Sequence, residues 1–182
     1  CAPPASGKRS GSSPCPTVLS GPRLTPDVAN GSIRLDQSLT AVRPGMKLRA
    51  TLREGEAPAA VAEVAADRDF CPRLDLALPP RRRRLWSPDD PFLYDIDIEL
   101  LDANGHVVDR AATYAGLRSV TIEGKAVKIN GKTIFQRLVL DQGYYPDGIY
   151  TAPTDEALFG DIERSLAAGF NGARLHQKVF EE

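Results

Sequence analysis

Alternation of polar and apolar residues with a period of two constrains the fold of this chain more than any other feature. The clearest run spans residues 94–100 (Tyr-Asp-Ile-Asp-Ile-Glu-Leu). Four shorter runs repeat the pattern, at residues 32–36, 47–52, 61–64 and 73–78. A period of two places one face of a strand in a core and the other in water, which is typical of antiparallel sheets. The first two thirds of the chain are therefore predicted to be all-β.

Turn-forming dipeptides separate these runs, and Asn104-Gly105 is the strongest of them. It predicts a tight hairpin whose return strand runs from Val107 to Tyr114, with His106 facing solvent. Each sheet has one apolar face to bury, so two sheets must stack. We predict an immunoglobulin-like β-sandwich over residues 23–123, preceded by a loose tail rich in Pro, Ser and Gly at residues 1–22.

The pattern changes after residue 123. Residues 127–132 predict a strand that ends in an Asn-Gly turn, and residues 133–140 predict a longer strand of continuous apolar character. Such continuity is typical of a strand buried on both faces, as in a parallel sheet. The chain therefore passes from an all-β part to an α/β part.

A helix and a further strand follow this apolar segment. Thr154 is the expected N-cap, Leu158 and Ile162 begin an apolar stripe, and Gly169 is the expected helix end. Residues 171–176 read as the next strand. Residues 124–182 are thus predicted to form a β-α-β unit, the opening of an α/β fold.

Composition excludes some partners. Lys and Arg number 23 and Asp and Glu 24, giving a net charge of −1, so a nucleic-acid partner is not indicated. No apolar run approaches the roughly 20 residues needed to span a bilayer, so no membrane partner is predicted. No signal peptide is visible, which slightly favours a cytoplasmic location over others. The Arg81–Arg84 run could bind phosphate or an acidic polymer, but its shortness favours a solvated loop.

The three cysteines, Cys1, Cys15 and Cys71, are odd in number and match no zinc-binding spacing. We interpret them as free thiols, although a Cys1–Cys15 disulfide would staple the tail. The Asn30-Gly31-Ser32 tripeptide matches a glycosylation acceptor, but we favour a plain turn that enters a strand. Gly-rich phosphate loops and metal-binding motifs are absent from the sequence, so no cofactor and no metal are predicted.

Polar and aromatic residues cluster at the predicted carboxyl ends of the two α/β strands. Asp141 ends the first strand, Tyr144 and Tyr145 follow it, and Arg174 and His176 end the second. Tyrosines stack on sugar faces, while Asp and Arg hydrogen-bond hydroxyl groups, so these residues indicate a sugar site. Alternatively, the tyrosines pack their own loop and Arg174 makes a structural ion pair. No activated nucleophile and no pair of catalytic carboxylates can be assigned.

Four motifs, in this order, resemble glycoside hydrolase family 2, which includes β-galactosidases, β-glucuronidases and β-mannosidases. Residues 85–94 (LWSPDDPFLY) are similar to the family's L-W-S-P-x-x-P-x-L-Y signature. Residues 114–120, 130–137 and 170–174 resemble the strand after the sandwich and the first two strands of the family's catalytic (β/α)₈ barrel. The resemblance implies an immunoglobulin-like domain followed by the start of that barrel.

The resemblance also implies hydrolysis of terminal β-glycosidic bonds, with Asp141, Arg174 and His176 lining the sugar subsite. In the family, the acid/base and nucleophile glutamates lie on later barrel strands, past residue 182. These 182 residues are therefore expected to lack glycosidase activity in isolation. Residues 140–146 (LDQGYYP) and 174–177 (RLHQ) depart from the family's N-R-H-E-H-H-P and R-T-S-H, which leaves the sugar open.

Two other hypotheses stand beside a fragment of a glycosidase. A non-catalytic module could bind carbohydrate or self-associate as a homo-oligomer through an open sheet edge. A small hydrolase could have acquired activity near Asp141 and His176.

Overall fold

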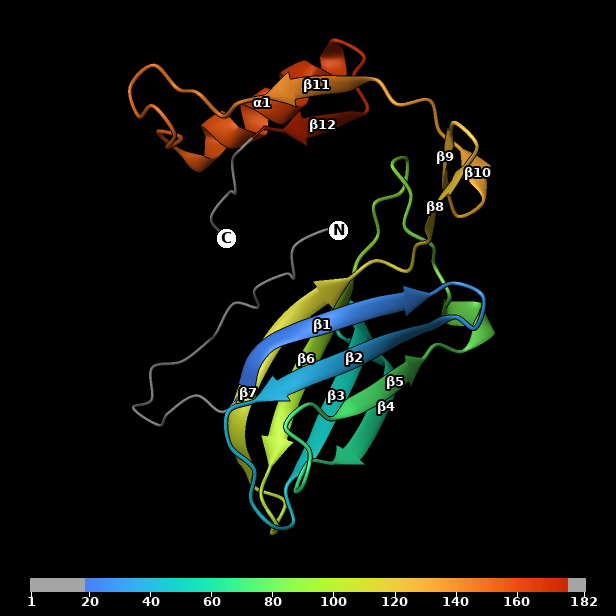
Figure 1. Cartoon of the computed structure of the whole chain (residues 1–182), viewed down its shortest axis with the longest axis vertical. Coiled ribbons are helices and arrows are strands. Elements are labelled where there is room, and N and C mark those ends of the chain that lie inside the picture. The colour runs from blue at the N-terminus through green and yellow to red at the C-terminus, as the bar shows by residue number, and fades with distance from the viewer. Residues whose placement is uncertain (1–18, 177–182) are drawn as a thin grey trace. The chain divides into compact units, whose positions relative to one another are not determined.

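The computed structural model describes residues 19–176 and divides the chain into two compact units. Among the described residues, the first unit comprises 19–121 together with Ile129–Gly131, and the second comprises Ile122–Lys128 and residues 132–176. Figure 1 shows the elements of both. Residues 1–18, with Cys1 and Cys15, and residues 177–182 lie outside the described residues. The predictions of a tail and of a disulfide there are therefore not addressed by the structure.

The first unit is a sandwich of two antiparallel sheets (Figure 1). One sheet has the order β1-β2-β5 and the other β4-β3-β6-β7. The fourth strand pairs with the third rather than the fifth, giving a three-plus-four arrangement of the immunoglobulin type. The strands are β1 (Leu19–Asp27), β2 (Ser32–Leu39), β3 (Lys47–Glu54), β4 (Ala57–Ala65), β5 (Arg73–Ala77), β6 (Tyr94–Leu101) and β7 (Val107–Ala115). The predicted β-sandwich is confirmed.

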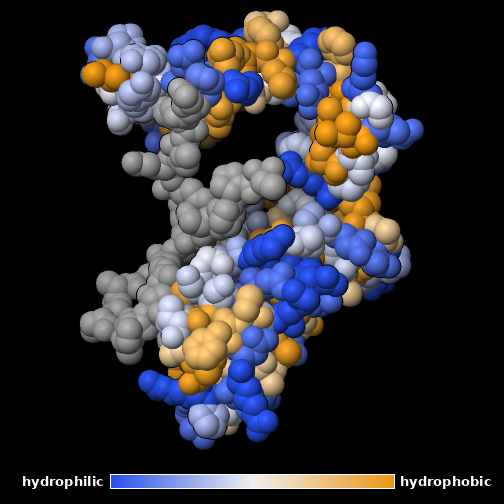
Figure 2. All heavy atoms as spheres, in the orientation of Figure 1, coloured by the Kyte–Doolittle hydropathy of each residue, from blue (hydrophilic) through white to orange (hydrophobic). Residues whose placement is uncertain are grey.

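The core follows the period of two read from the sequence. Alternate residues of β2, β3 and β6 are buried, for example Ile33 and Leu35 in β2 and Ile96 and Ile98 in β6. Between them, outward residues pair across strands: Arg34 Nε lies 3.0 Å from Asp75 Oδ1. Figure 2 shows hydrophilic residues mixed with smaller apolar patches over the sandwich surface that faces the viewer. The one-sided burial that the alternation predicts is thus present.

Strand β1 begins at Leu19, so the prediction that residues 19–22 belong to a loose tail is wrong. Leu19 is only 2% exposed. The pairing of β1 with β2 shifts between Leu19 and Pro22, and the side-chain Nε2 of Gln37 donates to the Ser20 carbonyl within that shift. This irregularity breaks the alternation at the start of the strand, which hid the strand from a reading of the sequence.

Tyr94 forms a corner at the start of β6. Its side chain is fully buried, and its hydroxyl donates to the Arg82 carbonyl at 2.5 Å and accepts from the Arg84 amide at 2.7 Å. Immunoglobulin-like sandwiches use a tyrosine in this way, near the start of the sixth strand, to fasten the preceding connection. The last residue of the family-like LWSPDDPFLY motif is thus a structural anchor.

The arginine run lies in this fastened connection, beside the 3₁₀ turn η1 (Pro80–Arg82). Arg82 Nη1 donates to the Pro58 carbonyl and Arg83 Nε to the Leu78 carbonyl. The Arg84 guanidinium pairs with Asp90 and lies over the Phe92 ring. Three of the four arginines therefore make contacts within the sandwich, and Arg81, Arg83 and Arg84 stay exposed, in agreement with the predicted solvated loop.

The asparagine-glycine turns form as predicted. In the β6–β7 hairpin the Asp102 amide donates to the His106 carbonyl, and the His106 side chain is exposed. A second turn at Asn130 and Gly131, both with left-handed φ angles, joins β9 (Ala126–Ile129) to β10 (Lys132–Thr133). With β8 (Val120–Glu123) these strands form a small sheet of order β10-β9-β8.

The second unit contains a β-α-β unit of β11 (Leu138–Asp141), α1 (Asp155–Ala167) and β12 (Gly172–Leu175). Strands β11 and β12 pair in parallel. The Thr154 Oγ1 accepts from the Ala157 amide, and Gly169 has a left-handed φ of 86° just after the helix. The predicted helix, its caps and the second strand are confirmed.

One strand prediction in this unit is wrong. Residues 133–140 do not form a single buried strand, because β10 ends at Thr133 and β11 begins at Leu138. β10 pairs with β9, whereas β11 pairs with β12, so the chain changes partner between them. Phe135 in the connection is 81% exposed. Apolar character alone does not reveal where a chain changes its pairing partner.

Candidate functional site

The carboxyl ends of β11 and β12 bring residues from two parts of the chain to one edge. Parallel strands end at the same edge of their sheet. Asp141, the last residue of β11, is in register with Leu175, the last residue of β12. The His176 amide donates to the Asp141 carbonyl at 2.9 Å. The structure therefore places the predicted residues Asp141 and His176 side by side along the backbone.

The side chains of this edge divide between two faces. Arg174 is in register with Leu140, one position before Asp141. Because successive side chains of a strand point to opposite faces, Arg174 lies on the face opposite to Asp141. Within residues 19–176, Arg174 forms no ion pair, and its side chain is exposed. The structure does not bring the two side chains together.

The Asp141 carboxylate organises the start of the following loop. Its Oδ1 accepts from the Gly143 amide at 2.6 Å. Gly143 is buried and has a left-handed φ of 61°, which a side chain would strain. Asp141 thus shapes the loop as well as offering a second carboxylate oxygen at the edge.

The loop from Gln142 to Pro153 carries three tyrosines with different contacts. The Tyr145 hydroxyl donates to Asp161 Oδ2 on α1 at 2.8 Å. This bond to a carboxylate raises the pKa of the Tyr145 phenol above its usual value, with Asp141 adding a smaller effect. The rings of Tyr144 and Tyr150 lie 4.9 Å apart, centroid to centroid. Of the two predicted tyrosines, Tyr145 is tethered and Tyr144 pairs with another ring.

Sequence reasoning did not assign Tyr150 or Asp161 to the site. Tyr150 is six residues after Tyr144, and its role depends on the loop folding back on itself. Asp161 lies 16 residues from Tyr145 and looks like any exposed polar residue of an amphipathic helix. In the sequence, only the high number of tyrosines in this loop points to Tyr150, and no pattern points to Asp161.

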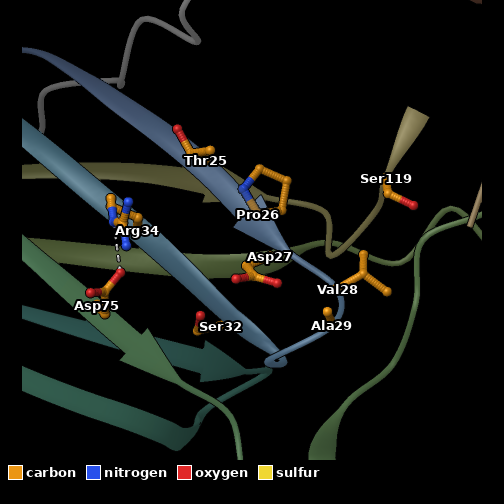
Figure 3. A pocket seen from close by; sticks show the side chains of 9 residues that line it. All are labelled: Thr25, Pro26, Asp27, Val28, Ala29, Ser32, Arg34, Asp75 and Ser119. Carbon is orange, nitrogen blue, oxygen red and sulfur yellow. Dashed lines mark hydrogen bonds and ion pairs between the residues drawn. The ribbon is translucent and has the colours of Figure 1, made fainter. Parts of the chain in front are cut away.

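The sandwich has a separate surface hollow of about 540 Å³ (Figure 3). Its lining comes from the end of β1, the turn into β2, and neighbouring positions on β2 and β5. The charged groups there are already paired: Arg34 with Asp75, and the Asp27 carboxylate with the amide and side chain of Asn30. The Asn30 bonds lower the pKa of Asp27. The charged groups of this hollow are therefore engaged with one another or with the turn, which argues against a charged ligand there.

Three of the family-like motifs meet in one structural cluster. The Arg118 guanidinium lies 4.5 Å from the Trp86 ring centroid. Asn130 Nδ2 donates to the Trp86 carbonyl at 2.9 Å, and Asn130 Oδ1 accepts from the Ser119 amide at 2.9 Å. Gly116 allows the Trp86 side chain to approach, because a Cβ there would lie 3.0 Å from Trp86 Cβ. These motifs hold structure together rather than supply catalytic groups.

Two further classes of site were sought in the part of the chain that the structure covers. Over residues 19–176, no group of three or more His, Cys, Asp or Glu side chains is arranged to hold a metal ion. No helix in the same range is long and apolar enough to cross a membrane. The side chains at the ends of β11 and β12 are therefore the best candidate site.

The family is decided by comparison with known proteins. The sequence profile of the glycosyl hydrolases family 2 matches residues 20–118, which hold all seven strands of the sandwich except the first residue of β1. The chain belongs to this family. The resemblance inferred from the four motifs is thereby confirmed for this family 2 protein.

Curated relatives include β-galactosidases and a β-glucuronidase. The β-galactosidase of Lactococcus lactis is 32% identical over 91 residues, half of this chain and 9% of the relative. The β-galactosidase of Vibrio vulnificus is 28% identical over 179 residues, 87% of this chain and 17% of the relative. The family 2 chain thus spans only 9% and 17% of the lengths of these two relatives.

Solved structures share the fold at low sequence identity. A β-glucuronidase from Ruminococcus gnavus in complex with D-glucuronic acid superposes with a TM-score of 0.71 at 19% identity, covering 90% of this chain and 27% of that one. A family 2 member from Bacteroides cellulosilyticus gives a TM-score of 0.74 at 23% identity, covering 88% and 22%. These similarities support the fold of the family 2 chain.

Proposed function

We propose that this chain is the immunoglobulin-like domain and the first β-α-β unit of the catalytic (β/α)₈ barrel of a family 2 glycoside hydrolase. That enzyme hydrolyses terminal β-glycosidic bonds. The alignment with the Vibrio vulnificus β-galactosidase carries the proposal, because it covers 87% of the chain and so extends past the sandwich. In this proposal the immunoglobulin-like domain is residues 23–123, extended to Leu19 by the start of β1, and the barrel segment is residues 124–182.

Exposed apolar side chains support a barrel origin for the second unit. Leu138 and Leu140 of β11, Leu175 of β12 and Phe159 and Ile162 of α1 all expose more than two fifths of their surface. Figure 2 shows apolar residues over the segments that hold β11 and α1. Further strands and helices of a (β/α)₈ barrel cover such residues. The unit resembles one part of a larger layered domain.

The sugar site of the proposed enzyme lies at the carboxyl ends of β11 and β12. Catalytic and binding groups of (β/α)₈ barrels gather at this face. Asp141, Tyr144 and Tyr145 supply a carboxylate and aromatic rings from the first strand end. Arg174 and His176 supply basic groups from the second. We assign these five residues to sugar binding, with Arg174 contributing from the face of the strand pair opposite to Asp141, and none of them to the acid/base or nucleophile role.

The 182 residues alone are expected to be inactive as a glycosidase. Retaining and inverting mechanisms both need two carboxylates flanking the bond that breaks. At this edge the Asp141 carboxylate is already engaged by the Gly143 amide, and no second carboxylate faces it from β12. The family resemblance places the two catalytic glutamates on later strands.

One pair of assays tests the proposal. Nitrophenyl β-galactoside, β-glucuronide and β-mannoside are offered to the 182-residue chain and to the protein made from the uninterrupted coding sequence that contains it. We expect turnover from the longer protein and none above buffer from the shorter one. If the 182-residue chain shows turnover that is lost in Asp141→Ala or His176→Ala, the prediction that it is inactive in isolation is contradicted. A longer protein that cleaves none of the three contradicts the glycosidase assignment.

A self-associating module is the second candidate, favoured by the same exposed apolar residues. Light scattering of the 182-residue chain tests this candidate. Association through the exposed apolar residues should make the average molecular mass rise with protein concentration, and Leu140→Lys should abolish that rise. Acquired hydrolase chemistry at Asp141 and His176 has less support. These residues meet through backbone atoms, and neither activates a nucleophile.

A further inference from the structure

We propose that Tyr144 and Tyr150 together form the surface on which a pyranose ring of the substrate stacks, and that Tyr145 and Asp161 are positioning residues for that surface. The inference rests on the proposed glycosidase function and deepens it. It adds Tyr150, which the sequence places in the loop after the first strand end but which was not among the assigned site residues, and Asp161, which no motif or strand end indicated.

The two rings form an exposed aromatic pair. Their centroids are 4.9 Å apart with an interplanar angle of 56°. Tyr144 is 65% exposed and Tyr150 is 60% exposed. Rings that only pack a loop bury most of their faces, whereas these two leave theirs open. Both rings belong to the loop that starts at the edge where Asp141 ends its strand.

The loop that carries the pair is braced at its base. The Tyr145 amide donates to the Ile149 carbonyl at 2.9 Å, and the Ile149 amide donates back to the Tyr145 carbonyl at 3.1 Å. This reciprocal pair closes the chain between the two rings. The bond from the Tyr145 hydroxyl to Asp161 then ties the closed loop to α1. Positions 144 and 150 are thereby held next to each other.

Ile149 adopts a backbone conformation that β-branched residues avoid. Its φ is 56°, in the left-handed region that favours glycine. Its neighbour Gly148 has no room for a side chain, because a Cβ would lie 2.1 Å from the Thr151 carbonyl oxygen. Strained residues of this kind persist where the surroundings hold them, and they gather at ligand clamps. The strain here lies directly before Tyr150.

The chemistry of this surface fits a sugar ring. The apolar C–H face of a pyranose stacks on an aromatic ring, while its hydroxyl groups need hydrogen-bonding partners. Both are available at this edge: the open tyrosine faces and the Asp141 carboxylate, which lies close enough to Tyr145 to influence its pKa. A hydrogen bond with Tyr144 raises the pKa of the Tyr150 phenol and links the two rings.

Ligand-observed NMR with the 182-residue chain tests the stacking surface, using methyl β-galactopyranoside and methyl β-glucuronide as probes. Tyr144→Ala and Tyr150→Ala are expected to weaken binding about tenfold, and Tyr150→Phe to retain it, because the ring remains. Tyr114→Ala is the matched control, since Tyr114 is an exposed tyrosine on β7. Binding unaffected by either alanine variant overturns the inference and leaves the family function standing. If the wild-type chain binds neither glycoside, the proposed sugar site at this edge is contradicted. The glycosidase function is tested separately, by the turnover assays.

The positioning role needs a readout of its own. Asp161→Asn removes the carboxylate that raises the Tyr145 pKa, so ultraviolet titration should find one phenol ionising at lower pH. The same variant should weaken glycoside binding severalfold without lowering the melting temperature. An unchanged titration, or unchanged binding with the titration shifted, contradicts the role of Asp161.

Discussion

Removing the Tyr94 hydroxyl should destabilise the sandwich by about 2 kcal/mol. In the Tyr94→Phe variant the ring stays in place, edge-on to Phe92 with centroids 4.9 Å apart, so packing changes little. Two partners lose their bond: the Arg82 carbonyl at 2.5 Å and the Arg84 amide at 2.7 Å. Each hydrogen bond contributes about 1 kcal/mol net, and more when the remaining group is buried. For a domain of this size the loss corresponds to a fall in melting temperature of about 10 °C.

Urea unfolding followed by tryptophan fluorescence measures this loss. Trp86 is the only tryptophan, and it belongs to the sandwich, so the signal reports that unit alone. Tyr114→Phe removes a hydroxyl from an exposed ring and should cost less than about 0.5 kcal/mol. If Tyr94→Phe costs no more than this control, the corner does not fasten the connection before β6, and the reasoning fails.

Three further predictions follow from local geometry. Burial raises the pKa of the Tyr94 phenol above its usual 10.0, so Tyr94 ionises in the unfolded state at a lower pH than in the folded state. The free energy of unfolding that wild type gains over Tyr94→Phe should therefore be constant below pH 10 and decrease above it. Urea unfolding at a series of pH values measures this difference. Gly116→Ala should lower the free energy of unfolding in urea by about 1–3 kcal/mol, because the new Cβ would lie 3.0 Å from the Trp86 Cβ. The control Gly21→Ala should leave that free energy nearly unchanged, because the space around Gly21 is open. The amides of His106 and Asn104 lower the pKa of Asp102 below 3.8. Hydrogen exchange should therefore find the amides of the β6–β7 hairpin better protected in wild type than in Asp102→Ala above pH 3.8. This difference in protection should disappear as the pH falls through the folded-state pKa of Asp102.

The sandwich was predictable from sequence because each strand buries one face. The run from Tyr94 to Leu100 shows this directly, since its odd positions in the run are buried without exception. The start of β1 was not predictable, because the irregular pairing near Pro22 interrupts the alternation that would reveal a strand. Local pattern thus identifies regular strands and misses those that begin with an irregularity.

The candidate site shows the same limit at longer range. The sequence indicated that Asp141 and His176 end neighbouring strands, and their backbone hydrogen bond agrees. It did not indicate that Arg174 lies on the opposite face, because that depends on the register of β11 and β12. The tether from Tyr145 to Asp161 joins two residues that no local pattern links. Contacts set by register and by loop closure require the folded structure.

The most direct test of the account is hydrolysis of nitrophenyl β-glycosides by the protein made from the uninterrupted coding sequence that contains these residues. The account predicts turnover of at least one of the β-galactoside, β-glucuronide and β-mannoside, reduced in the Asp141→Ala variant. A folded protein that hydrolyses none of them would contradict the assignment of this chain to an active family 2 glycosidase.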